Sequence, residues 1–294
     1  MTWYLVIGGD GLIGKNLFEG LCSGGLITYK TSRRNVRDKL TFPFDLNNPL
    51  TLFNDIKFNK KMQDSSPVVF ISASITGLAN CENDPKETAK INVDSTVKIA
   101  EEFLKKGSFV IFLSSNAIFS YSKSPPDEKA EPFSTTEYGR QKISAEEILR
   151  KYVNEIRPSG KLAIVRLTKV MSKSLPIISR WKKIIESNQL IEAFNNKYVS
   201  PISVNYCVSS LVKISELQKP GIYHLSGSEN ITYYELAKML VKKWGTSMKL
   251  VKEIVEQDFY EKSVTNIASL SMRCTTEITG IQPQKIEEVI EELC

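Results

Sequence analysis

Hydrophobic runs alternate with helical patterns along the first half of the chain. Five apolar runs predict β-strands, at Trp3–Ile7, Leu26–Thr31, Val68–Ala73, Phe109–Ser114 and Leu162–Leu167. Between them, apolar residues recur at helical spacing over 93–104 and 143–152. Strands that alternate with helices are joined by right-handed crossovers into a parallel sheet. We therefore predict the α/β class and a doubly wound parallel sheet.

The alternation becomes irregular after about Thr168. The pattern predicts helices over Ile177–Ser187 and Val204–Leu217 and a short strand over Gly221–Leu225. Thr232 and Glu235 form the pattern of a capping box, which opens a helix that runs to Trp244. We predict a first domain over 1–168 and a smaller, interleaved lobe over 169–294, some segments of which return to the sheet.

Composition and charge narrow the possible partners. The chain has 294 residues, of which 41% are hydrophobic, and a net charge of +6. It has no basic run that indicates nucleic acid, and no apolar run long enough to span a membrane. The five cysteines lack metal-ligand spacing, and the first strand begins near Met1, without room for a signal peptide. We expect reduced thiols, no metal and a cytoplasmic location.

A glycine-rich turn follows the first predicted strand. Gly9, Gly11 and Gly14 fit the Gly-x-Gly-x-x-Gly spacing, and apolar residues from Leu12 and Ile13 onward then recur at helical spacing. Such a loop allows the backbone to approach a pyrophosphate, and the helix N-terminus offers free N–H groups to it. The loop therefore predicts a dinucleotide-binding site.

The residues after the second predicted strand bear on which dinucleotide binds. An enzyme that uses NAD usually carries an acid there, about 20 residues after the loop. This chain has Arg33 and Arg34 instead, whose guanidinium groups suit a 2′-phosphate. We favour NADP over NAD, with a pair of exposed surface arginines as the alternative.

Two motifs indicate proton-transfer chemistry. Tyr138 and Lys142 are four residues apart, so on a helix they share one face, where a cation is expected to lower the pKa of a tyrosine. Ser114 and Ser115 end a predicted buried strand, and ligands of parallel sheets bind beyond the carboxyl ends of the strands. A Tyr-x-x-x-Lys pair alone also occurs by chance on solvated helices.

Together these motifs resemble the extended short-chain dehydrogenase/reductase family, over roughly residues 1–170 and in family order. The resemblance extends to Asp45 and Leu46, to Ala73 and Ser74, and to Asn92. It implies a Rossmann domain over 1–168 and a mainly substrate-binding lobe over 169–294. The expected cofactor-binding residues are Gly8, Gly11, Leu12, Ile13, Gly14, Arg33, Arg34, Asp45, Leu46, Ala73, Ser74, Asn92, Tyr138 and Lys142.

The resemblance also implies three catalytic roles. Ser115 matches the residue that hydrogen-bonds the reacting carbonyl or hydroxyl, and Tyr138 matches the proton donor or acceptor. Lys142 matches the residue that lowers the pKa of the tyrosine and binds the nicotinamide ribose. The implied chemistry is hydride transfer at the nicotinamide.

The segment 198–202 resembles the matching stretch of the dTDP-4-dehydrorhamnose reductase branch. The acidic pair of 4,6-dehydratases is absent, because Asn116 and Ala117 stand there, and Tyr198 departs from the arginine of UDP-sugar epimerases. We therefore expect an NADP-dependent reductase of a nucleotide-activated 4-keto (deoxy)sugar. The alternatives are a nucleotide-sugar epimerase with tightly bound NAD and a non-catalytic cofactor-binding subunit. Members of this family often form homodimers.

Three further residues have two interpretations each. Asp10 lies in the glycine loop, where its charge opposes phosphates, so we expect it to turn outward or to bind turn N–H groups. Trp181 lies among basic residues that suit a nucleotide, but an amphipathic helix explains the pattern better. His224 is the only histidine, and we expect it to be packed rather than bound to a metal.

Overall fold

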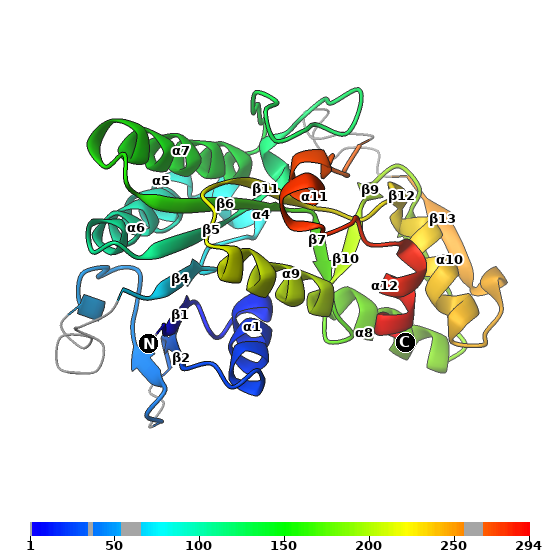
Figure 1. Ribbon diagram of the computed structural model, residues 1–294. Helices are drawn as coiled ribbons and strands as arrows, with labels where there is room; N and C mark the ends of the chain where they lie inside the picture. Colours follow the sequence, from blue (N-terminus) through cyan, green and yellow to red (C-terminus); the bar gives the residue numbers. More distant parts are fainter. Residues whose placement is uncertain (1, 35–37, 54–65, 256–266) are drawn as a thin grey trace. The chain divides into compact units, whose positions relative to one another are not determined.

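The computed structural model describes residues 2–34, 38–53, 66–255 and 267–294 (Figure 1). Its internal contacts divide the chain into two compact units. The first unit comprises Met1–Ile118, Pro132–Arg166 and Val208–Tyr223, and the second comprises Phe119–Glu131, Leu167–Cys207 and His224–Cys294.

A seven-stranded sheet forms the centre of the first unit. In spatial order its strands are β11 (Gly221–Leu225), β6 (Lys161–Leu167), β5 (Phe109–Ser115), β4 (Val68–Ile71), β1 (Tyr4–Ile7), β2 (Thr28–Ser32) and β3 (Thr41–Pro43). The pairs β1–β2, β1–β4, β2–β3 and β4–β5 are parallel. The chain order reverses between β1 and β4, which is where a doubly wound sheet opens a crevice for ligands. The predicted fold class is confirmed.

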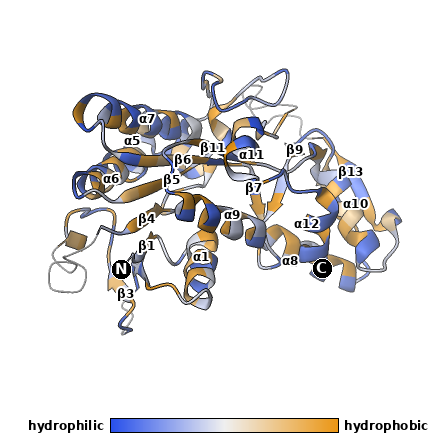
Figure 2. Cartoon of the chain, viewed as in Figure 1, coloured by the Kyte–Doolittle hydropathy of each residue, from blue (hydrophilic) through white to orange (hydrophobic). Residues whose placement is uncertain are grey.

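Helices cover both faces of this sheet (Figure 1). Leu5 and Ile7 of β1 and Phe112 of β5 point to one face, where they join a core with residues of α6 and α7. Figure 2 shows that β4 and β5 consist mostly of hydrophobic residues, and most residues along both strands are buried, as expected for a sheet with water excluded from both faces. In the described part of this unit, the α- and π-helical segments include α1 (Leu12–Ser23), α4 (Leu78–Asn83), α5 (Pro85–Ala89), the π-helical segment Lys90–Ser95, α6 (Thr96–Lys105), α7 (Glu137–Lys151), the π-helical segment Tyr152–Ile156 and α9 (Val204–Leu217), which enters the unit at Val208.

The second unit consists of helices and short paired strands around its own core. The strand pairs are β7 (Lys169–Met171) with β10 (Pro201–Ser203), β8 (Ile191–Phe194) with β13 (Val251–Ile254), and β9 (Tyr198–Val199) with β12 (Ile231–Thr232). The helices are α8 (Pro176–Glu186), α10 (Tyr233–Lys243), α11 (Arg273–Thr279) and α12 (Ile286–Leu293). The predicted capping box is present at the start of α10, between Thr232 and Glu235.

Two of the ambiguous residues belong to the interior of this unit. Trp181 is buried in the core with α10 and α12, so the helix that carries it is amphipathic, as favoured from the sequence. His224 is fully buried, and its Nδ1 lies 2.9 Å from the carbonyl oxygen of Ser271. Packing explains both side chains.

Within the described ranges, no helix combines the length and apolar character that a membrane crossing requires. The same residues contain no group of three or more His, Cys, Asp or Glu side chains that could hold a metal ion.

Candidate functional site

The glycine loop connects β1 to α1, and two of its glycines are required by the fold. Gly8 has a φ of +95°, and a Cβ there would lie 2.7 Å from the backbone nitrogen of Ala73. A Cβ on Gly14 would lie 2.2 Å from the carbonyl oxygen of Gly8, so only glycine lets α1 pack this closely against the loop. Both positions follow from the tight strand–turn–helix connection.

Gly11 differs from these two because the protein does not itself require glycine there. Its φ of −77° is open to any residue, and the nearest atom to an added Cβ is the Gly8 carbonyl oxygen, at 3.6 Å. Gly11 is the N-cap of α1 and has no side chain to cap the first N–H groups of the helix. The open space beside it, next to uncapped N–H groups, fits the pyrophosphate of a dinucleotide.

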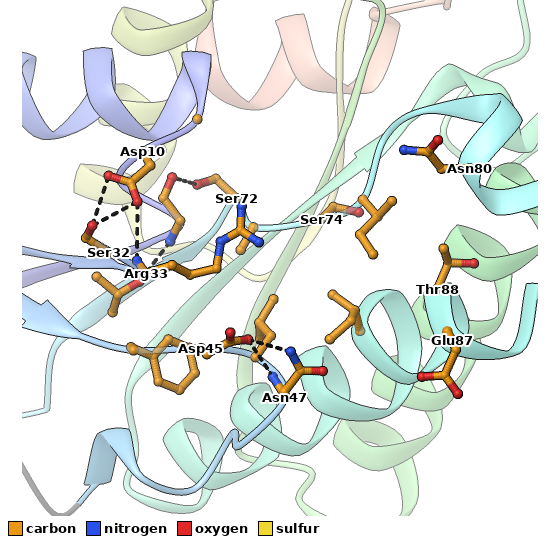
Figure 3. A pocket seen from close by; sticks show the side chains of 18 of the residues that line it. Asp10, Ser32, Arg33, Asp45, Asn47, Ser72, Ser74, Asn80, Glu87 and Thr88 are labelled. Atoms are coloured by element: carbon orange, nitrogen blue, oxygen red, sulfur yellow. Dashed lines mark hydrogen bonds between the residues drawn. The ribbon is translucent and has the colours of Figure 1, made fainter. Parts of the chain in front are cut away.

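The loop forms one wall of a cavity of about 630 Å³ (Figure 3). The cavity is of the size that small-molecule sites have, and it lies at the carboxyl ends of β1, β2, β3 and β4. Its lining comprises Gly8, Asp10, Gly11, Thr31, Ser32, Arg33, Phe44, Asp45, Leu46, Asn47, Ser72, Ala73, Ser74, Ile75, Asn80, Asn83, Asp84, Glu87, Thr88 and Ile91.

The cavity brings together seven of the cofactor-binding residues expected from the sequence. They are Gly8, Gly11, Arg33, Asp45, Leu46, Ala73 and Ser74. Leu12, Ile13 and Gly14 form the first turn of α1 instead, and Arg34 donates its backbone N–H to the Ser32 hydroxyl. Residues of α4 and α5 also line the cavity and were not predicted from the sequence, although Asp84 before Pro85 is a recognisable helix start.

Tyr138 and Ser115 come together where α7 begins beside the end of β5. Gly139 makes this possible, because a Cβ there would lie 2.2 Å from the carbonyl oxygen of Ala117. The Tyr138 hydroxyl is hydrogen-bonded with the side chains of Ser115 and Ser74. Ser74 also lines the cavity, so the Tyr138 hydroxyl lies one side chain away from the cavity.

The protonation of Tyr138 differs from the expectation. Burial, together with the nearby Cys81, raises the pKa of Tyr138 to about 12, although the hydrogen bonds with Ser115 and Ser74 lower it. The expected lowering of this pKa by Lys142 is wrong for this structure. The physical reason is desolvation, because a phenolate is poorly stabilised away from water. Tyr138 is therefore a phenol at neutral pH and has a proton to donate.

Lys142 is buried one turn along α7 from Tyr138. Its Nζ lies 5.8 Å from the centre of the Tyr138 ring and donates a hydrogen bond of 3.0 Å to the Leu113 carbonyl oxygen. Burial lowers the pKa of Lys142 to about 8, against the opposing effect of the Glu146 carboxylate. Glu146 in turn forms a buried ion pair with Arg166 of β6, at 2.7 Å, which ties α7 to the sheet.

Asn92 does not line the cavity, but its side chain is hydrogen-bonded to two residues that do. Its Oδ1 accepts hydrogen bonds from the Ser74 hydroxyl and the Ile75 N–H, both at 2.8 Å. Its Nδ2 donates to the Ile75 carbonyl oxygen at 3.0 Å and to Gln141 Oε1 at 2.8 Å. The fully buried Asn92 thus connects the segment after β4 to α7 and holds Ser74 toward Tyr138. Gln141 was missed, because nothing in its local sequence indicates a partner 49 positions away.

Comparison with known proteins places the chain in a family. The model of the family described as the RmlD substrate binding domain matches residues 1–294. The spore coat polysaccharide biosynthesis protein SpsK of Bacillus subtilis (strain 168) is 22% identical over 99% of this chain and 96% of its own length. A bifunctional dTDP-4-dehydrorhamnose 3,5-epimerase/dTDP-4-dehydrorhamnose reductase of Arabidopsis thaliana is 24% identical over 74% of this chain and 70% of its own length.

Solved structures share the fold. The dTDP-4-dehydrorhamnose reductase of Bacillus anthracis str. Ames, in complex with NADP, superposes with a TM-score of 0.83 at 17% identity, over 99% of this chain and 97% of that one. A UDP-glucose 4-epimerase of Thermotoga maritima with UDP-glucose gives a TM-score of 0.83 at 19% identity, over 100% and 97%. At these identities the likeness concerns the fold alone, which reductases and epimerases have in common.

Proposed function

The chain belongs to the RmlD substrate binding domain family, and from this premise we propose that it is an NADP-dependent reductase of a nucleotide-activated 4-keto (deoxy)sugar. The curated relative from Arabidopsis thaliana supports the reductase activity by its name. In this proposal residues 1–168 bind the cofactor, and residues 169–294 mainly bind the sugar nucleotide.

The observation that carries the proposal is that Tyr138 and Ser115 come together beside Ser74, which lines the cavity. Reduction of a ketone produces an alkoxide, which needs a proton as it forms. With a pKa of about 12, Tyr138 holds its proton at neutral pH, and a newly formed alkoxide is a strong enough base to take it. Ser115, which is hydrogen-bonded with Tyr138, is placed to bind the same oxygen.

The cofactor, when bound, supplies the hydride, and residues of this chain supply the proton and orient the substrate. Tyr138 donates its proton to the C4 oxygen of the sugar, while Ser115 orients that oxygen. Lys142, protonated below its pKa of about 8, binds the ribose next to the nicotinamide, which is the second role that the family resemblance implies for it. Arg33 supports the choice of NADP, because its guanidinium group lines the cavity and suits a 2′-phosphate.

Purified protein incubated with NADPH and a panel of nucleotide 4-keto sugars tests the proposal. Loss of NADPH absorbance with one member of the panel is the expected result. The Tyr138→Phe variant should turn over about 10²–10⁴-fold more slowly and still bind the cofactor. Tyr152→Phe is the matched control, since Tyr152 is buried in the core behind α7 and should keep full activity.

Two outcomes would replace the proposal by one of its alternatives. Protein that carries NAD from purification and interconverts sugar nucleotides without net consumption of NADPH is an epimerase. Protein that binds the cofactor but turns over no sugar, with or without Tyr138, is a binding subunit. A homodimer and a cytoplasmic location remain predictions, which light scattering and cell fractionation test.

A further inference from the structure

The glycine loop carries a carboxylate that reaches the residues following β2. Asp10 accepts hydrogen bonds from the Ser32 hydroxyl, with oxygen–oxygen distances of 2.8 and 3.0 Å. It also accepts from the backbone N–H of Arg33 at 3.3 Å. Asp10, Ser32 and Arg33 all line the cavity, and Figure 3 shows the two hydrogen-bonded contacts. This resolves the two interpretations of Asp10 in favour of binding a neighbouring turn.

The Asp10 carboxylate lies in the region where doubly wound folds distinguish NAD from NADP. In doubly wound folds the residues about 20 positions after the loop meet the adenosine ribose, at its 2′-hydroxyl or its 2′-phosphate. Ser32 and Arg33 are those residues here, and neither is an acid. Asp10 of the glycine loop supplies a negative charge beside these two residues. It also accepts hydrogen bonds from the Ser32 hydroxyl and the Arg33 N–H, which are donors that a 2′-phosphate would use.

We propose that Asp10 is a specificity-determining residue, a carboxylate in the glycine loop that takes the place of the acid missing after β2. This inference rests on the proposed function and deepens it. Asp10 accepts hydrogen bonds from the ribose hydroxyls of NADH and repels the 2′-phosphate of NADPH. Arg33 acts in the opposite direction, so the preference for NADPH in the native protein is smaller than the arginine alone would produce.

Two variants separate charge from structure at this position. Asp10→Asn keeps an oxygen that accepts from Ser32 and Arg33 but removes the charge. Its ratio of NADPH to NADH affinity should rise about tenfold, because a 2′-phosphate carries nearly two negative charges at neutral pH. Asp10→Ala removes the hydrogen bonds as well. Glu19→Gln is the matched control, since it removes an exposed carboxylate of α1 that pairs with Lys15 and does not line the cavity.

Titration of each variant with NADPH and with NADH, followed by nicotinamide fluorescence, measures the ratio without turnover. A raised ratio in Asp10→Asn, reduced at high ionic strength, and an unchanged ratio in Glu19→Gln support the proposal. An unchanged ratio in Asp10→Asn, with equal weakening of both dinucleotides in Asp10→Ala, overturns it and leaves Asp10 a structural residue. If the native protein binds neither dinucleotide, the proposed function fails and this inference fails with it.

Discussion

Replacement of Gly11 by alanine should separate ligand binding from folding. The added Cβ meets one protein atom, the Gly8 carbonyl oxygen, at the ordinary contact distance of 3.6 Å. The backbone at Gly11, with φ −77° and ψ 165°, is one that alanine adopts without strain. The methyl group therefore projects into space that the fold does not use, beside the first turn of α1.

The effect of this change on stability should be small. Alanine is a poorer N-cap than glycine, which costs a few tenths of a kcal/mol or somewhat more. It also restricts the unfolded chain, which stabilises the folded state by about 0.4–1 kcal/mol. These effects oppose each other, so we expect the free energy of unfolding to stay within about 1 kcal/mol of the native value. Urea denaturation measures it.

The effect on dinucleotide binding should be large. A methyl group at Gly11 occupies the approach of the pyrophosphate and moves the phosphates away from the helix N-terminus. A loss of about 2–3 kcal/mol corresponds to a dissociation constant roughly 30- to 150-fold higher. Fluorescence titration with NADPH and NADH measures it, and both dinucleotides should weaken equally because both contain the pyrophosphate. Native affinity in this variant would refute the assignment of the space beside Gly11 to the pyrophosphate.

Gly14→Ala should instead lower the free energy of unfolding by about 3 kcal/mol in urea denaturation, because its Cβ would lie 2.2 Å from the Gly8 carbonyl oxygen; native stability would contradict this contact. The pKa of Lys142, about 8 in the folded protein, lies below its ordinary value of 10.5, so the unfolded chain binds more protons between these pH values and stability rises with pH there. In denaturation series, the free energy of unfolding of the native protein, measured relative to that of Lys142→Met, should therefore rise by at most about 3 kcal/mol from pH 8 to 10.5. A difference between the two proteins that does not change with pH would refute the burial of the Lys142 charge. Thr232→Ala should cost about 1 kcal/mol by breaking the capping box with Glu235, without a change in NADPH affinity, and an altered affinity would contradict a purely local role.

Local patterns in the sequence were enough to predict much of the first unit. The run before the glycine loop predicted β1, and the helical pattern over 143–152 predicted most of α7, although the structure begins this helix earlier, at Glu137. The short strand β3 was not predicted, and neither were the strand pairs of the second unit. These strands have two to four residues, too few for an alternating pattern to stand out.

Properties that depend on distant neighbours could not be predicted in the same way. The buried pair of Asn92 and Gln141 and the contact between Asp10 and Ser32 join residues far apart in the chain. The raised pKa of Tyr138 also belongs to this group. A sequence shows that a lysine stands one turn away, but desolvation depends on everything packed around the phenol.

The sequence by itself determined the doubly wound fold and the loop that receives a dinucleotide, because both follow from hydrophobic periodicity and from glycines at short spacing. It also determined which residue types, a serine, a tyrosine and a lysine, are available for chemistry. Only the tertiary structure decided that the tyrosine keeps its proton, since burial sets that pKa. Only the tertiary structure brought Asp10 to Ser32 and Arg33, because the parallel pairing of β1 with β2 brings the loop and the end of β2 to one edge of the sheet.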